Sequence, residues 1–155
     1  MALVQESKRT YNAMVNSGSI RYALYPVVAG KMVAGVALPT DDNATAKAWG
    51  AATEVFAAKT ITTDFWVCGI QVLLCAGTNE EQRAVQIGSG AVGTPTWLAD
   101  FAFLLTAKAT PNVGPFLLPY PILLAANTAM CGRAAETTKE AAKSQTIAVL
   151  IATGL

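Results

Sequence analysis

Residues 65–75 read FWVCGIQVLLC, an apolar run that contains a single polar side chain, Gln71. The run is followed by a turn signal, GTNEE, over residues 77–81. Aromatic and β-branched residues are enriched in strands, and a short apolar run bounded by turn residues is typical of a strand within a sheet. This stretch therefore predicts a strand in a β-rich fold.

The same pattern repeats outward from this run, because short apolar segments alternate with turns from about residue 46 onward. Paired prolines in residues 115–124 predict a strand at a sheet edge or a strand entrance. Residues 145–152 are apolar on both faces, so they predict a strand buried on both sides. The remaining predicted strands are residues 49–57, 83–87, 97–107 and 127–133.

These segments predict an all-β fold, namely an antiparallel β-sandwich, jelly-roll-like, of about seven to eight strands. The core of such a sandwich is built from the aromatic and β-branched side chains that lie inside the apolar runs. The expected core residues are Trp49, Phe65, Val67, Val85, Ile87, Phe101, Phe103, Ile147, Val149 and Ile151.

Residues 1–45 differ from the rest of the chain because they show no sustained hydrophobic period. We expect an extended N-terminal arm and linker over residues 1–45, followed by the β-sandwich domain over residues 46–155. Arginine and tyrosine are enriched in interface hot spots, whereas a solvated tail explains the same residues equally well. The candidates for contacts with a partner or another protomer are Lys8, Arg9, Tyr11, Arg21, Tyr22 and Tyr25.

The composition restricts the chemistry of the chain. Of its 155 residues, 53% are hydrophobic, 14% are charged and none is histidine. The absence of histidine excludes Ser-His-Asp and Cys-His catalysis and His-ligated zinc. The net charge of +1 argues against a nucleic-acid partner held by counterion release. We therefore expect no enzymatic activity, no cofactor, no metal and no nucleic-acid partner.

The longest uncharged run, residues 109–132, has enough residues to span a bilayer. It contains four prolines, however, and a lipid-exposed helix cannot accommodate so many lost backbone donors. The sequence therefore predicts no membrane span.

Three local patterns have a structural interpretation and a functional one. Residues 88–93, GSGAVG, match the spacing of a dinucleotide-binding loop, but another strand follows, so a tight bulged β connection is favoured. Cys68, Cys75 and Cys131 are interpreted as small buried hydrophobes of a reducing compartment, and the first two face opposite sides of one strand. Residues 134–143 favour a polar hairpin loop, and a short helix is the alternative.

Trp66 and Trp97 are the best candidates for a carbohydrate-stacking platform, which requires two or three exposed aromatic side chains on one face. Packing in the core is the alternative for both residues.

The order of segments resembles that of capsid decoration (cement) proteins of tailed bacteriophages, which have β-sandwich or jelly-roll folds. The resemblance covers residues 46–153 and rests on AWGAATEV at 48–55, VQIGSGAVGT at 85–94, LPYPI at 118–122 and ANTAMCGR at 126–133. Ala129 stands where the family pattern often has a basic residue.

The resemblance implies a virion protein, made in the host cytoplasm, that binds the outer capsid surface and stabilises the shell. Its implied partners are the major capsid protein and its own copies, as a homotrimer, with N-terminal arms that reach neighbouring capsomers. The alternatives are another minor virion protein, such as a tail or head-fibre component, and a carbohydrate-binding or adhesin-type β-sandwich module.

The composition agrees with self-association. A mean hydropathy of +0.40 suggests more apolar surface than a monomer of this size covers by itself. Symmetric assembly covers such surface, and many weak contacts on a repeating lattice gain strength through multivalency.

Overall fold

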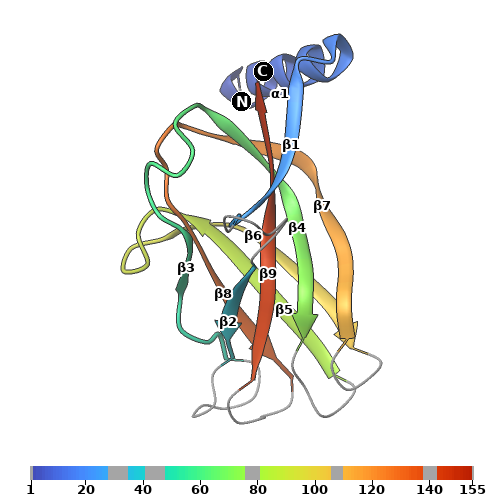
Figure 1. The fold of residues 1–155 in the computed structure, drawn as a ribbon, viewed down its shortest axis with the longest axis vertical. Coiled ribbons are helices and arrows are strands. Elements are labelled where there is room, and N and C mark those ends of the chain that lie inside the picture. Colours follow the sequence, from blue (N-terminus) through green and yellow to red (C-terminus); the bar gives the residue numbers. More distant parts are fainter. Residues whose placement is uncertain are drawn as a thin grey trace.

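The structure is a computed structural model that describes residues 2–27, 35–40, 48–75, 81–105, 110–137 and 143–154 (Figure 1). One helix precedes nine strands in the described part of the chain. These elements are α1 (Ala2–Ser17), β1 (Ile20–Tyr25), β2 (Val36–Pro39), β3 (Thr53–Phe56), β4 (Phe65–Cys75), β5 (Glu81–Ser89), β6 (Thr96–Leu105), β7 (Thr110–Leu124), β8 (Met130–Glu136) and β9 (Ser144–Gly154).

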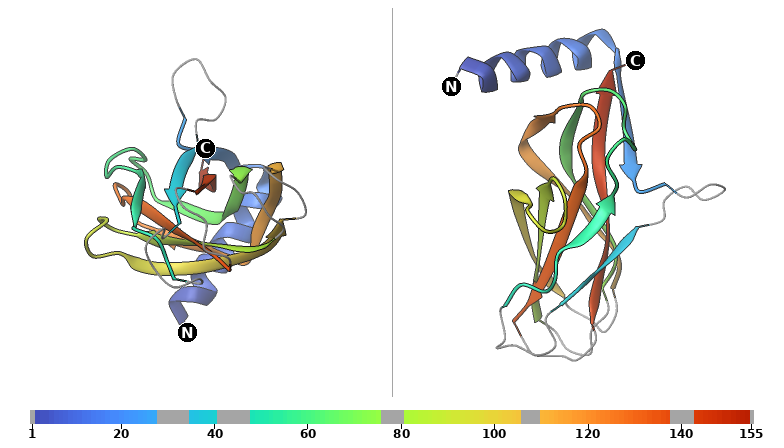
Figure 2. Two further views of the ribbon diagram at one scale, coloured as in Figure 1. Left: turned by 90° about the horizontal axis from the view of Figure 1, so that it is seen from below. Right: turned by 90° about the vertical axis from the view of Figure 1, so that its left-hand side faces the viewer.

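The strands form two antiparallel sheets that pack face to face (Figures 1 and 2). Sheet A has the order β1–β9–β4–β7, and β2 also pairs with β9. Sheet B has the order β3–β8–β5–β6. The expected antiparallel β-sandwich is therefore confirmed.

The strand pairing is nested, as in a jelly roll. Because β4 lies along one side of β9, β1 and β2 share the other side and act as one interrupted strand. The interrupted strand β1/β2 pairs with the last strand, β9. The next strand inward from each end of the chain pairs likewise: β3 with β8, β4 with β7, and β5 with β6. This is the order obtained when one long antiparallel hairpin is rolled into two sheets.

The core lies between the two sheets. All the expected core residues except Trp49 belong to it, and none of these nine is more than 8% exposed. The central strand β9 is buried on both faces, as predicted, because Ile147 and Val149 face the core while Ala148 and Ala152 on the other face are also 0% exposed.

The extended N-terminal arm is not confirmed. Residues 2–17 form the helix α1, which lies across one end of the sandwich beside the end of β9 (Figures 1 and 2). Residues 20–25 and 36–39 pair with β9 and are part of sheet A. All six residues of β1 pair with β9, so this segment gains a ladder of backbone hydrogen bonds by joining the sheet.

Two strand boundaries also differ from the prediction. Residues 134–136, expected in a polar loop, continue β8, whereas residues 138–142 lie outside the described part. The strand expected over residues 49–57 is confined to β3. The tight bulged connection over residues 88–93 is confirmed, because a register shift at Gly88 precedes the turn between β5 and β6.

No helix in the described residues has both the length and the apolar character needed to cross a membrane.

Candidate interaction surface

Helix α1 is attached to the outer face of sheet A by one narrow stripe. Ser7, Tyr11 and Met14 are half-buried and follow helical spacing, so they lie on one side of the helix. Beneath them lies Trp66, which is only 5% exposed. The Trp66 ring centroid is 5.8 Å from that of Tyr11, and its indole N–H donates to the Ser7 hydroxyl at 3.4 Å. The rest of the described helix surface faces solvent.

Tyr11 connects the helix to the sheet. Its hydroxyl forms a 2.7 Å hydrogen bond with the hydroxyl of Tyr22 on β1 and lies 3.9 Å from the Cys68 sulfur. Burial, with these hydrogen bonds, raises the pKa of Tyr11 above its ordinary value. The Tyr11 phenol therefore remains neutral to a higher pH than an ordinary tyrosine does.

A bulge in β7 places Tyr120 next to this helix. In the pairing with β4, Leu117 lies opposite Gly69 and Ile122 lies opposite Val67, so residues 118–121 together face the single residue 68. The bulged sequence is LPYP, and each proline lacks the N–H that a ladder requires. The chain consequently leaves the sheet here, and Tyr120 is 59% exposed.

A groove of about 380 Å³ separates α1 from the bulge of β7. The Lys8 ammonium lies 3.8 Å above the Tyr120 ring centroid, a cation–π contact that closes one side of the groove. Leu117 and Leu123 extend the apolar surface along β7, with 63% and 41% of each residue exposed. We call Lys8, Tyr11, Leu117, Tyr120 and Leu123 the α1–β7 surface.

This surface has the character of an interface. Exposed apolar groups that lie together and are bordered by polar groups are typical of protein contact sites. β7 is the edge strand of sheet A, as predicted from its prolines. Because Pro119 and Pro121 cannot donate hydrogen bonds, this stretch of the edge does not offer a full ladder to an added strand.

The predicted contact residues have three different environments. Lys8, Tyr11 and Tyr22 come together around α1. Arg9 and Arg21 are exposed. Tyr25 is half-buried and packs against the core with its ring centroid 5.7 Å from that of Phe56.

The tryptophans also differ from expectation. Trp66 lies on sheet A beneath α1 and Trp97 lies on sheet B, so the two do not form one carbohydrate platform. Trp49 is half-buried rather than part of the core, and its ring centroid is 5.0 Å from the guanidinium of Arg133 on β8.

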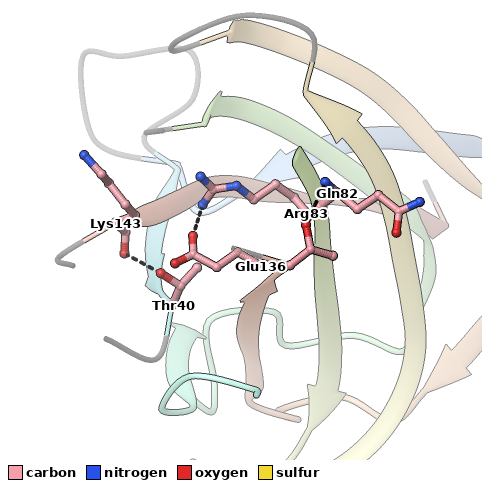
Figure 3. Close-up of polar contacts among 6 residues, drawn as sticks. Thr40, Gln82, Arg83, Glu136 and Lys143 are labelled. Atoms are coloured by element: carbon pink, nitrogen blue, oxygen red, sulfur yellow. Dashed lines mark hydrogen bonds and ion pairs between the residues drawn. The ribbon is translucent and has the colours of Figure 1, made fainter. Parts of the chain in front are cut away.

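A buried ion pair joins the strands of sheet B on their inner face (Figure 3). The side chains of Arg83 on β5 and Glu136 on β8 are 0% and 4% exposed and are direct cross-strand neighbours. Nearby, the Thr40 hydroxyl donates to the Lys143 carbonyl at 3.3 Å (Figure 3). The Thr40 backbone N–H donates to the same carbonyl at 3.1 Å, so the end of β2 is connected to the start of β9. These contacts hold the register of the sandwich at the end remote from α1.

The three cysteines are free and buried. Cys68 lies on the outer face of sheet A and Cys75 lies in the core, so the prediction that they face opposite sides is confirmed. Burial raises the pKa of the Cys75 thiol to about 11, although Arg83 acts in the opposite direction. Burial also raises the pKa values of Cys68 and Cys131. Among the described residues, no three His, Cys, Asp or Glu side chains gather as a metal-binding group.

Comparisons of the chain with models of known protein families, with curated proteins and with solved structures found no match.

Proposed function

We propose that the chain is a structural virion protein that binds the outer surface of a phage capsid and stabilises the shell, as a decoration or cement protein without catalysis. The observation that carries this proposal is the α1–β7 surface, in which an edge strand and a helix present exposed apolar and aromatic side chains. The resemblance of residues 46–153 to capsid decoration proteins supports the same function.

The position of the surface suits attachment to a larger body. It lies at one end of the sandwich, where α1 crosses the strands and leaves most of its own length in solvent (Figure 2). Lys8 adds positive charge above the Tyr120 ring, and Arg9 and Arg21 are exposed elsewhere on α1 and β1. Aromatic side chains and arginine are the residue types most often found in interface hot spots. In this proposal α1 replaces the extended arm as the element that meets neighbouring subunits.

The proposed partners are the major capsid protein and further copies of this chain, as a homotrimer. Symmetric self-association covers apolar groups such as Leu117 that a single copy leaves in water. On a shell, each copy contributes a weak contact, and the repeated lattice makes the attachment stable.

The experiment that tests this function examines virions of the virus whose genome encodes the chain. We expect copies distributed over the capsid lattice in cryo-electron microscopy, and we expect shells assembled without the gene to release DNA at a lower temperature. Copies confined to the tail or to one vertex would favour a tail or head-fibre component instead. Virions that lack the chain altogether would contradict the proposal.

A further inference from the structure

The outer face of sheet B carries a polar row that runs across three strands. Gln86 on β5 lies directly opposite Asp100 on β6 and Arg133 on β8. The Arg133 Nε–H donates to the Gln86 side-chain oxygen at 2.6 Å, and the Gln86 amide donates to an Asp100 carboxylate oxygen at 2.5 Å. The side-chain oxygen and the side-chain nitrogen of Gln86 are thus both hydrogen-bonded, which fixes the orientation of its amide group.

Two tryptophans frame the Arg133 end of this row. The guanidinium lies 4.2 Å from the Trp97 ring centroid and 5.0 Å from that of Trp49. A one-residue bulge at Leu98 turns Trp97 to the outer face of β6. Stacking on two indoles holds the guanidinium plane in one orientation.

Gly88 makes room for the Trp97 ring, and Gly50 allows the backbone next to Trp49 to approach β2. At Gly88, an added Cβ would lie 2.9 Å from the Trp97 ring. At Gly50, an added Cβ would lie 2.1 Å from the Pro39 carbonyl oxygen, and the Gly50 N–H donates to the Ala134 carbonyl at 2.8 Å. The backbone beside Trp49 is therefore packed against Pro39 of β2 and hydrogen-bonded to β8.

The next row of the sheet forms the floor of a cleft of about 180 Å³. Its floor consists of three alanines in register, Ala84, Ala102 and Ala135. Trp49 also lines the cleft, and the remaining lining residues are polar or charged, namely Gln82, Arg83, Glu136 and Thr137. Rows on one face of a strand are two residues apart, about 6.6 Å. The Arg133–Gln86–Asp100 row does not line the cleft itself. It lies one such spacing from the alanine row, so a ligand as wide as a sugar ring can reach it.

This row retains capacity to bind a ligand. Within the described residues, the second carboxylate oxygen of Asp100 and the terminal nitrogens of Arg133 have no hydrogen-bond partner. The site thus offers acceptors and donors next to a flat apolar floor and an indole. The charges of Arg133 and Asp100 cancel, as do those of the ion pair Arg83 and Glu136 that lines the cleft.

We propose that this cleft binds a neutral pyranose sugar. The apolar C–H face of the ring contacts the alanine floor and Trp49, while its hydroxyl groups donate to Asp100 and accept from Arg133. The hydrogen bonds that hold Arg133, Gln86 and Asp100 already exist in the free protein, so these side chains lose little conformational entropy when the sugar binds. The site lies on sheet B and does not depend on the capsid-binding function proposed for the α1–β7 surface.

The test uses the three indole N–H signals of the ¹⁵N-labelled protein, since the chain has three tryptophans. The methyl glycosides of glucose, galactose, mannose and N-acetylglucosamine are titrated separately, and glucuronate serves as the acidic probe. We expect at least one neutral sugar to shift the Trp49 signal saturably at millimolar concentration and to leave the Trp66 signal, beneath α1, unchanged. Asp100→Asn should weaken that binding about tenfold, because a hydrogen bond to a charged acceptor is replaced by a weaker one.

Tyr120→Ala on sheet A is the matched control and should bind the sugar as the wild type does. Trp49→Phe, which keeps an aromatic ring, provides a second variant if Asp100→Asn fails to fold and should also bind more weakly. Because this variant lacks the Trp49 indole, its binding is read from the backbone amide signals of Ala84 and Ala102. The proposal is overturned if no neutral sugar shifts the Trp49 signal, if glucuronate alone does so, or if the folded variants bind as the wild type does.

Discussion

The outer faces of the two sheets are built from different kinds of residue. On sheet A, Trp66, Cys68 and Ala152 form an apolar patch that α1 covers. On sheet B, Arg133, Gln86 and Asp100 form a hydrogen-bonded row that meets solvent. The outer face of sheet A is thus covered by helix α1, whereas the outer face of sheet B is stabilised by hydrogen bonds among its own side chains.

The difference indicates what each face can bind. Apolar side chains gain free energy when protein covers them, and β7 continues the apolar surface of sheet A beyond the edge of α1. A polar row with an aromatic frame suits a hydrophilic ligand. Four substitutions test this comparison.

The largest expected effect is that of Trp66→Ala on sheet A. Trp66 is 5% exposed beneath α1, and truncation of a buried tryptophan costs about 3–5 kcal/mol. We expect the free energy of unfolding in urea to fall by this amount, and amide hydrogens of α1 to exchange faster. Unchanged exchange in α1 would show that the helix does not depend on this patch.

Trp97→Ala is the matched substitution on sheet B and should cost less. Trp97 is half-buried and contacts Arg133 from one side, so we expect a loss of about 1–2 kcal/mol in the same urea experiment. Equal losses for the two tryptophans would remove the distinction between a covered face and a face open to solvent.

The two cysteines on the outer faces give a finer comparison. Cys68 lies beneath Tyr11, whereas Cys131 is 0% exposed within sheet B. In Tyr11→Ala, we expect a thiol reagent at pH 8 to label Cys68 about tenfold faster. The reason is that the local opening that exposes Cys68 should require about 1.4 kcal/mol less free energy once the Tyr11 side chain is removed. The labelling rate of Cys131 serves as the internal control and should not change. An equal increase at both sites would indicate general unfolding instead.

The smallest expected effect is that of Lys8→Ala. Its ammonium is exposed above Tyr120, and such a cation–π contact contributes about 0.5–1 kcal/mol at most. Thermal unfolding at low and high salt measures this contribution, which we expect to be small under both conditions. A loss comparable to that of Trp66→Ala would mean that Lys8 has a structural role that the geometry does not explain.

The sequence predicted elements well where one residue pattern dominates. The uninterrupted apolar run of residues 65–75 matches β4, and the two apolar faces of residues 145–152 match the central position of β9. The prolines of β7 correctly indicated an edge strand. In each case local composition and tertiary environment favour the same structure.

The remaining features depend on contacts that composition does not reveal. The stripe that attaches α1 includes the polar residue Ser7, so it lacks the apolar period that would predict a helix. Trp97 faces outward because of the bulge at Leu98, and a shift of one residue exchanges the two faces of a strand. The α1–β7 surface combines segments more than one hundred residues apart. Its local signals were the basic and tyrosine residues of the N-terminal segment, which include Lys8 and Tyr11, and the prolines of LPYP, which predict an interrupted ladder.

The most direct test of the α1–β7 surface as an intermolecular interface is a binding isotherm on shells that lack the chain. Tyr120→Ser combined with Leu123→Ser removes its apolar centre, and Asp100→Asn on sheet B serves as the control. We predict that the double variant, with unchanged thermal unfolding, binds the shells at least about tenfold more weakly while the control binds as the wild type does. Equal affinity of the wild type and the double variant would contradict this account.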